Sequence, residues 1–247
     1  MKPSHLVMLP GWGMEQAAFQ PLIDPLSKVF QLSFVEWRGV KSPNDFRERV
    51  EETIISIQEP VFLLGWSLGS LAALEFAITY PNSVKGLILI AGTSRFTSCE
   101  HYSFGWHPRI VERMKKKLQR NKEKTLADFY DSMFSESEKE AGFFSQFAEI
   151  VQRKFQGDDI FSLITGLDYL LQKDMRVRIG QIKTSCLLIH GKKDVICPIE
   201  ASSFIGAKLG DKSTFYVLED AGHVPFFTKL EKCVQLIINF VQKEVDT

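Results

Sequence analysis

The sequence predicts an α/β fold in which helices cover both faces of a mainly parallel sheet. Short apolar runs, each about as long as a buried strand, alternate with amphipathic helical patterns, and this order is typical of parallel strands joined by helices. The predicted strands are residues 6–9, 32–35, 61–64, 87–90, 186–189 and 215–218. The predicted helices are residues 14–28, 44–57, 68–79, 199–209 and 228–243.

One interval departs from this alternation. Residues 91–184 contain no convincing strand pattern, only helical patterns rich in charge and phenylalanine, with breaks near Pro108, Gly142 and residues 157–159. We therefore expect residues 1–94 and 181–247 to form the sheet and its covering helices. Residues 95–180 are expected to form a helical insertion, a lid over the carboxyl ends of the strands.

Length and composition indicate a single neutral enzyme-sized domain. The 247 residues are 45% hydrophobic, enough for one substantial core. Lysine plus arginine equals aspartate plus glutamate at 30 each, so no overall field favours nucleic acid as a partner. Residues 1–5 lead into an apolar run too short for a signal peptide or a membrane span. We expect a cytoplasmic monomer without a membrane or nucleic-acid partner.

The cysteines do not suggest a metal or redox site. Cys99, Cys186, Cys197 and Cys233 are widely separated and include no Cys-x-x-Cys pair. We expect buried or incidental free thiols.

The most informative motif is Gly65-Trp66-Ser67-Leu68-Gly69, which follows the apolar run 61–64 and precedes a helical pattern. A serine with glycine at both second neighbours, between a strand and a helix, is typical of a nucleophile elbow. The turn is so tight that side chains at the glycine positions would clash. The motif predicts Ser67 as a catalytic nucleophile; the alternative is an ordinary strand-to-helix turn.

A serine nucleophile requires a base and an acid that orients the base. Asp194 follows the predicted strand 186–189 and His223 follows the strand 215–218, so both lie where parallel strands end. The order Ser67, Asp194, His223 is that of the α/β-hydrolase triad. Glu219 and Asp220 are alternative acids, but neighbours on the same short loop rarely aim a carboxylate at the far ring nitrogen of a histidine.

Two backbone amides are candidates for binding the oxyanion that forms on the ester carbonyl. The Leu68 N–H directly follows the nucleophile at a helix start. The Trp12 N–H lies in Pro10-Gly11-Trp12-Gly13, which follows the strand 6–9. A flexible turn with a surface tryptophan is the alternative for this loop. This chemistry needs no metal or organic cofactor.

Together these motifs resemble the α/β-hydrolase superfamily over essentially the whole chain. The resemblance also includes the Gly191–Asp194 loop, which continues to Pro198, and the sequence Ala-Gly-His-x-Pro-Phe around His223. Within the superfamily, the chain is most similar to the pimeloyl-[acyl-carrier protein] methyl ester esterases of biotin synthesis. The Gly-Trp-Gly of the first loop and the tryptophan beside the nucleophile carry this similarity.

This resemblance implies that the Trp12 and Leu68 amides form the oxyanion hole. The chain departs from the family at Pro10, where a histidine is usual, and at Ser70, where a third glycine is common. The histidine is not a triad member, so its absence leaves the chemistry in place.

The helical insertion begins with a basic segment. Residues 109–124 contain eight basic and two acidic residues, a local excess of about +6. The resembled esterases dock an acidic acyl carrier protein through basic residues of the lid, and such complementarity raises encounter rate and specificity. We expect carrier-protein docking through Arg109, Arg113, Lys116, Lys117 and Arg120. A solvated helix face is the alternative.

The insertion is also rich in phenylalanine. It holds nine of the twenty in the chain: Phe96, Phe104, Phe129, Phe134, Phe143, Phe144, Phe147, Phe155 and Phe161. Some must form the core of the insertion, whereas others are suited to line an acyl channel. The residues expected to bind substrate are Trp12, Trp66, Phe129, Phe134 and Phe226.

These observations predict a serine esterase that removes a small alkyl group, plausibly methyl, from a medium-chain acyl ester such as pimeloyl on acyl carrier protein. Three alternatives stay open. One is a general short-chain carboxylesterase or lactonase. Another is a lyase like the pyruvate-eliminating enzyme of the menaquinone pathway. The third is a ligand-binding receptor of the same fold without turnover.

Overall fold

The computed structural model describes residues 3–245, so the first two residues of the amino-terminal segment considered above lie outside it. Six strands form one sheet in the order β2-β1-β3-β4-β5-β6, with every neighbouring pair parallel. The strands are β1 Ser4–Leu9, β2 Phe30–Phe34, β3 Val61–Trp66, β4 Val84–Ile90, β5 Ser185–Gly191 and β6 Ser213–Leu218. The predicted α/β fold with a parallel sheet is confirmed.

The strand register brings the loops of interest to one edge of the sheet. All six residues of β3 are buried, as its uninterrupted apolar sequence predicts for a strand covered on both faces. At its carboxyl end, Gly65 pairs with Leu9 of β1 and Trp66 pairs with Ile90 of β4. Ile90 in turn pairs with Ile189 of β5. The loops after β1, β3 and β5 therefore begin next to one another.

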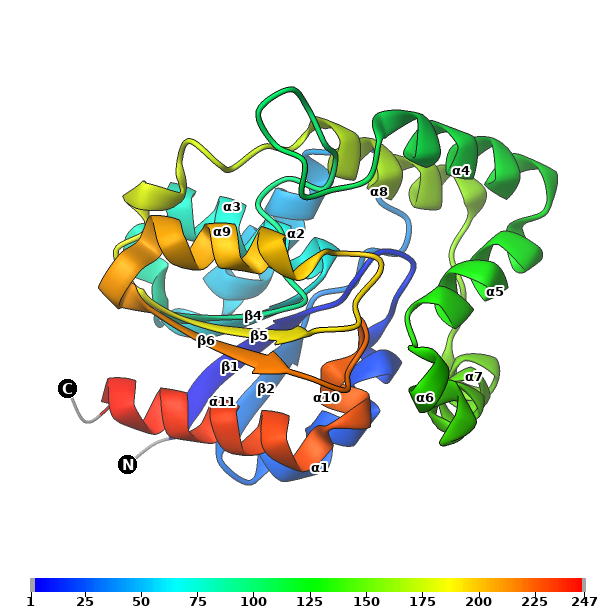
Figure 1. The fold of residues 1–247 in the computed structure, drawn as a ribbon. Coiled ribbons are helices and arrows are strands. Elements are labelled where there is room, and N and C mark those ends of the chain that lie inside the picture. The colour runs from blue at the N-terminus through cyan, green and yellow to red at the C-terminus, as the bar shows by residue number, and fades with distance from the viewer. Residues whose placement is uncertain (1–2, 246–247) are drawn as a thin grey trace.

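Helices cover both faces of the sheet (Figure 1). On one face, α1 (Gln20–Ser27) packs against α11 (Leu230–Val245). On the other lie α2 (Asp45–Ile57), α3 (Leu68–Thr79) and α9 (Ile199–Leu209). The α3 helix is buried on all sides except at Thr79, in keeping with its almost entirely apolar sequence. The short α10 helix (Pro225–Thr228) precedes α11.

The helix predicted over residues 14–28 is divided in the structure. Residues 16–19 form a 3₁₀ turn, and α1 begins only at Gln20. Pro21 lies in the first turn of α1, where a backbone N–H has no intrahelical acceptor, so proline costs no helical hydrogen bond there. The proline thus favours a new helix start within what reads as one amphipathic pattern.

Five helices lie between β4 and β5: α4 Pro108–Arg120, α5 Lys122–Ser132, α6 Glu136–Glu140, α7 Phe143–Lys154 and α8 Ile160–Gln172. Pro108 is the first residue of α4, and Gly142 separates α6 from α7 with a positive φ of 82°. Asp159 caps α8 by accepting a hydrogen bond from Ser162 N–H at 2.8 Å. Figure 1 shows α4 to α7 grouped beyond the carboxyl ends of the strands.

The two ends of this interval meet. Arg95, after β4, donates to Asp174, after α8, at 2.8 Å, and Met175 N–H donates to the Ser94 carbonyl at 2.8 Å. Arg176 also donates to the Asp174 carboxylate. This cluster of Ser94, Arg95, Asp174, Met175 and Arg176 is referred to below as the neck. Across residues 3–245, no helix combines the length and apolar character needed to cross a membrane.

Candidate active site

The backbone at Ser67 has the sharp conformation expected of a nucleophile elbow. Ser67 has φ 57° and ψ −117°, a region that non-glycine residues rarely occupy. A Cβ at Gly65 would lie 2.4 Å from the Gly69 carbonyl oxygen, and one at Gly69 would lie 2.1 Å from the Leu9 carbonyl oxygen. The steric reason for both glycines is confirmed. The strained turn places the buried Ser67 side chain at the carboxyl edge of the sheet, where it lines a small cavity.

Asp194 and His223 meet beside this elbow. His223 Nδ1 lies 2.7 Å from Asp194 Oδ2, and both side chains are at most 1% exposed. His223 Nε2 is also buried and has no hydrogen-bond partner among the described residues. The imidazole is therefore held through one nitrogen, while the other is available as a proton acceptor.

The alternative acids lie elsewhere. Glu219 pairs with Lys192 at 2.6 Å and Asp220 with Lys193 at 3.4 Å, and the side chains of both acids are more than half exposed. Neither carboxylate is aimed at the imidazole. The geometry favours Asp194 as the orienting acid.

Backbone donors and a second histidine hold the Asp194 carboxylate. Its Oδ1 accepts hydrogen bonds from the N–H groups of Ile196 at 2.8 Å and Cys197 at 3.0 Å. His190 Nε2 lies 3.2 Å from Oδ2. Burial by itself would raise the pKa of Asp194, but interactions with His223 and His190 lower it overall, so the carboxylate stays ionised.

The sequence reasoning did not find this role of His190. The ring is completely buried, with Nδ1 2.7 Å from Ser202 Oγ and Nε2 2.8 Å from the Cys197 carbonyl oxygen. Its position at the end of a strand, four residues before Asp194, was the available signal. Cys197 also contacts the site, because its side chain interacts with that of Ser67, and burial raises the pKa of the thiol.

The loop after β1 lies directly against the elbow. A Cβ at Gly11 would be 3.4 Å from Ser67 Cβ. Within the described chain, neither the Trp12 N–H nor the Leu68 N–H donates a hydrogen bond to another residue, so both remain available for an oxyanion. The alternative of a surface tryptophan is wrong, because the Trp12 side chain is 4% exposed and its Nε1 donates to the Leu163 carbonyl at 2.8 Å.

Side chains from outside the loop fix its carbonyl groups. Trp37 Nε1 donates to the Pro10 carbonyl at 2.8 Å, and the Tyr130 hydroxyl of α5 donates to the Gly13 carbonyl at 3.0 Å. Burial raises the pKa of Tyr130, so the hydroxyl stays protonated as a donor. The orientation of the Trp12 amide therefore depends partly on the helices between β4 and β5.

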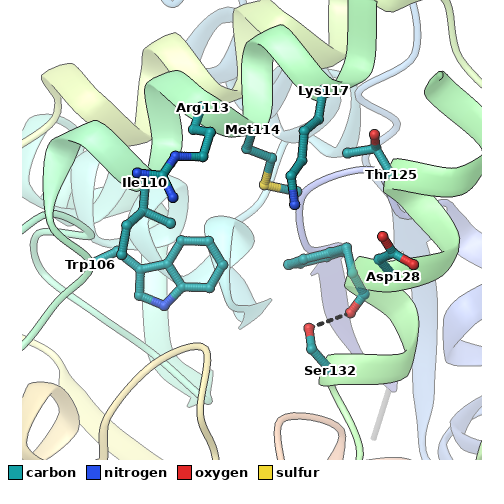
Figure 2. A pocket seen from close by; sticks show the side chains of 9 residues that line it. Trp106, Ile110, Arg113, Met114, Lys117, Thr125, Asp128 and Ser132 are labelled. Atoms are coloured by element: carbon teal, nitrogen blue, oxygen red, sulfur yellow. Dashed lines mark hydrogen bonds between the residues drawn. The ribbon is translucent and has the colours of Figure 1, made fainter. Parts of the chain in front are cut away.

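Two neighbouring cavities lie on the α4–α5 side of Ser67. The outer cavity, of about 220 Å³, lies between α4 and α5, and Figure 2 shows Arg113 and Lys117 reaching into it beside Trp106. A much smaller inner cavity, of about 10 Å³, contains Ser67 and is otherwise lined almost entirely by apolar side chains. The two cavities share Trp106, Met114 and Phe129. These three side chains form the constriction between solvent and Ser67.

The expected substrate residues fall into two groups. Trp12 and Phe129 line the inner cavity and pack edge to face, with ring centroids 5.0 Å apart. Trp66, Phe134 and Phe226 do not line it. Sequence alone gives no sign of this division, because all five are large apolar residues near motifs.

The second group supports the site from below. Trp66 Nε1 donates to the His223 carbonyl at 2.9 Å, and Phe226 packs edge to face on Trp66 at 5.0 Å. Phe134 contacts Phe147 and Phe227. Trp66, Phe134 and Phe226 therefore belong to the core next to the His223 loop, and none of them lines the inner or the outer cavity.

The expected docking residues share one exposed face of α4. Arg109, Arg113, Lys116, Lys117 and Arg120 are all exposed. Their spacing places them on one side of the helix, opposite the buried Val111, Met114 and Leu118. None of the five forms an ion pair with an acidic residue of the described chain. These five side chains, called the α4 stripe below, therefore present positive charge without an ion-pair partner beside the mouth of the outer cavity.

Comparison with known proteins gives the class of this molecule. A model of the α/β hydrolase fold matches residues 4–230, and the chain belongs to this family. It is 27% identical to the pimeloyl-[acyl-carrier protein] methyl ester esterase of Pseudoalteromonas atlantica, over 92% of this chain and 90% of that protein. It is 30% identical to the protein of the same name from a Shewanella species, over 94% and 88% of the two chains.

Solved structures share the architecture. An esterase from Exiguobacterium antarcticum superimposes with a TM-score of 0.86 at 21% identity, covering 98% of this chain and 93% of that one. At this identity the likeness concerns the fold. The resemblances to the superfamily and to the pimeloyl esterases, drawn above from motifs, are both confirmed.

Proposed function

We propose that this protein is a serine esterase that hydrolyses the methyl ester of a medium-chain acyl group, such as pimeloyl, carried by acyl carrier protein. The observation that carries the proposal is the buried His223–Asp194 pair, whose Nε2 has no partner among the described residues and whose loop is bonded to Trp66, the residue before Ser67. The names of the sequence relatives supply the substrate.

In the proposed reaction, Ser67 Oγ attacks the ester carbonyl while His223 Nε2 accepts the hydroxyl proton. The oxyanion of the tetrahedral intermediate is bound by the Trp12 and Leu68 amides. When the intermediate collapses, the bond between the acyl carbon and the methoxy oxygen breaks. His223 returns the proton to that oxygen, and methanol leaves. Water then hydrolyses the acyl-enzyme by the same steps. Asp194 stabilises the transient imidazolium throughout.

The arrangement of the two cavities, one at the surface and one at Ser67, is compatible with a substrate whose large group stays outside. The methyl ester would lie at Ser67, the acyl chain would pass the constriction of Trp106, Met114 and Phe129, and the carrier would remain outside. The small inner volume implies that these side chains separate when substrate enters. The exposed stripe of α4 beside the outer mouth matches an acidic carrier protein in charge.

The test is hydrolysis of p-nitrophenyl butyrate and of pimeloyl-acyl carrier protein methyl ester by wild type and Ser67→Ala. Loss of the nucleophile should lower kcat by at least about 10³-fold on both substrates. Ser27→Ala is the matched control, since Ser27 is exposed and bonds only to the Asp24 carbonyl of its own helix. Undiminished activity in Ser67→Ala would overturn the proposal.

The same assays separate the alternatives. Rapid hydrolysis of free esters or lactones with no preference for the carrier-bound ester would identify a general carboxylesterase or lactonase. Release of pyruvate from the menaquinone-pathway substrate without ester turnover would identify the lyase. Binding of acyl ligands without any turnover would identify a receptor.

A further inference from the structure

A buried carboxylate outside the site holds the loop that carries His223. Glu138 lies in α6 and is only 3% exposed. Its Oε1 and Oε2 accept the Gly222 N–H at 3.1 Å and 3.0 Å, and Oε2 also accepts the N–H and the hydroxyl of Ser135, at 2.8 Å and 3.0 Å. The carboxylate therefore joins the start of α6 to the residue immediately before His223.

The following residue is bound by the same segment. His223 N–H donates to the Met133 carbonyl at 2.8 Å, so two successive amides of the His223 loop find their acceptors within residues 133–138. The fit is close, because a Cβ at Gly222 would lie 2.6 Å from the Met133 carbonyl oxygen and 2.8 Å from Glu138 Oε2. Lys193, next to Asp194, also reaches Ser137 at 3.3 Å.

Helix capping alone does not account for this arrangement. A capping box needs only the bonds between Ser135 and Glu138. Burying a carboxylate is costly unless its oxygens receive donors, and here the additional donor comes from the catalytic loop, 84 residues away.

We propose that Glu138 is a positioning residue that fixes the backbone of His223. The inference rests on the proposed function, in which His223 is the base. The Nδ1 bond to Asp194 orients the ring, but the position of the ring also depends on where the loop backbone lies. Without Glu138, Gly222 N–H loses its acceptor and the loop is free to shift. Displacing a reacting group by about 1 Å costs up to about 100-fold in rate.

The test compares Glu138→Ala and Glu138→Gln with Glu140→Gln, a carboxamide change at an exposed position of the same helix. Kinetics with p-nitrophenyl butyrate, the rate of Ser67 labelling by a fluorophosphonate and the low-field proton resonance of His223 Nδ1–H report on the base. In Glu138→Ala, kcat and labelling should fall about 10- to 100-fold with KM nearly unchanged, and the resonance should weaken. Glu138→Gln retains one oxygen acceptor and should recover part of the rate, while Glu140→Gln should match wild type.

Thermal unfolding of each variant separates positioning from folding. A folded Glu138→Ala protein with wild-type kcat, labelling rate and Nδ1–H resonance would overturn the inference. A second result would also overturn the inference. It is a rate loss in Glu138→Ala with an unchanged Nδ1–H resonance, together with losses of kcat and stability in Glu138→Gln as large as those in Glu138→Ala. Gly222→Ala perturbs the contact from the other side and should lower kcat even if Glu138→Ala does not fold. Full activity in Ser67→Ala would refute the proposed function instead.

Discussion

Ser70 shows how one substitution within a motif is accommodated. It stands one residue after the glycine that ends the elbow motif, and it is completely buried. Its hydroxyl donates to the Gly65 carbonyl at 2.6 Å and lies 3.2 Å from the Ile90 carbonyl oxygen, which also accepts the Ser67 N–H. The serine therefore ties α3 to both strands that support the elbow.

We predict that Ser70→Ala destabilises the protein by about 1 to 2 kcal/mol, because a buried hydrogen bond is lost and its acceptors gain no replacement. Urea unfolding measures this loss. Ser56→Ala is the control, since Ser56 is an exposed helical serine that bonds to the Thr53 carbonyl. The Ser56 variant should change stability by less than about 0.5 kcal/mol. Equal stability of the Ser70 variant and wild type would contradict the role assigned to the hydroxyl.

Some side chains of the candidate site could be predicted from the sequence and others could not. Ser67, Asp194 and His223 could be selected because each lies in the segment that follows a strand, and a parallel sheet gathers such segments at one edge. Glu138 and Tyr130 could not be selected. Glu138 meets Gly222 across 84 residues, and Tyr130 meets Gly13 across 117. Periodicity identifies helices but does not encode how a chain of five helices folds back onto the core.

At the scale of secondary-structure elements, the strands were the most predictable. The uninterrupted apolar runs of the central strands reflect burial on both faces, as in β3, whereas the edge strands β2 and β6 are only partly buried. The helix predicted at 14–28 was less accurate, because an amphipathic pattern continues through Pro21 although the backbone restarts there. The α4 helix was predictable in both its charge and its start at Pro108, and its exposed stripe leads to a prediction at this scale.

We predict that Lys116→Glu/Arg120→Glu raises KM for a carrier-bound methyl ester at least about tenfold, because four units of charge change on a surface that meets an acidic partner. The increase should shrink at high salt, since salt screens exposed charges. Hydrolysis of p-nitrophenyl butyrate should change far less, as neither side chain lines a cavity. Steady-state kinetics across salt concentrations measure both effects.

The control for this prediction is Lys28→Glu/Lys85→Glu, which makes the same change in net charge at two exposed lysines outside α4. If both double variants raise KM for the carrier-bound ester equally, net charge rather than the α4 stripe governs association.

On the scale of the whole molecule, the helices between β4 and β5 are joined to the core through many contacts, and three groups of them concern the neck and the two loops beside Ser67. The neck closes their two ends, Leu163 and Tyr130 hold the Trp12 loop, and Glu138 holds the His223 loop. These contacts are spread over several helices and reach both sides of Ser67. The helices therefore hold both loops that lie beside Ser67, and the outer cavity lies on their α4–α5 side.

The stability that the neck contributes depends on pH. Hydrogen bonds from Arg176, opposed by partial burial, and a further bond from Arg95 lower the pKa of Asp174 from its ordinary 3.8 to about 2. Because the folded-state pKa is the lower one, the ion pairs stabilise the protein fully above about pH 4. Their contribution declines as the pH falls from about 4 toward 2, where the folded state also takes up the proton.

We predict that Asp174→Asn lowers the free energy of unfolding by about 1 kcal/mol at pH 7, as expected for a partly exposed ion-pair network. The difference from wild type should shrink as the pH falls through 4 and be small near 2, where about half of the wild-type carboxyl is already neutral. Urea unfolding between pH 2 and pH 7 measures it. Asp211→Asn serves as control, since Asp211 is an exposed acid outside the neck. A difference for Asp174→Asn that stays constant down to pH 2 would show that the ion pairs are not its source.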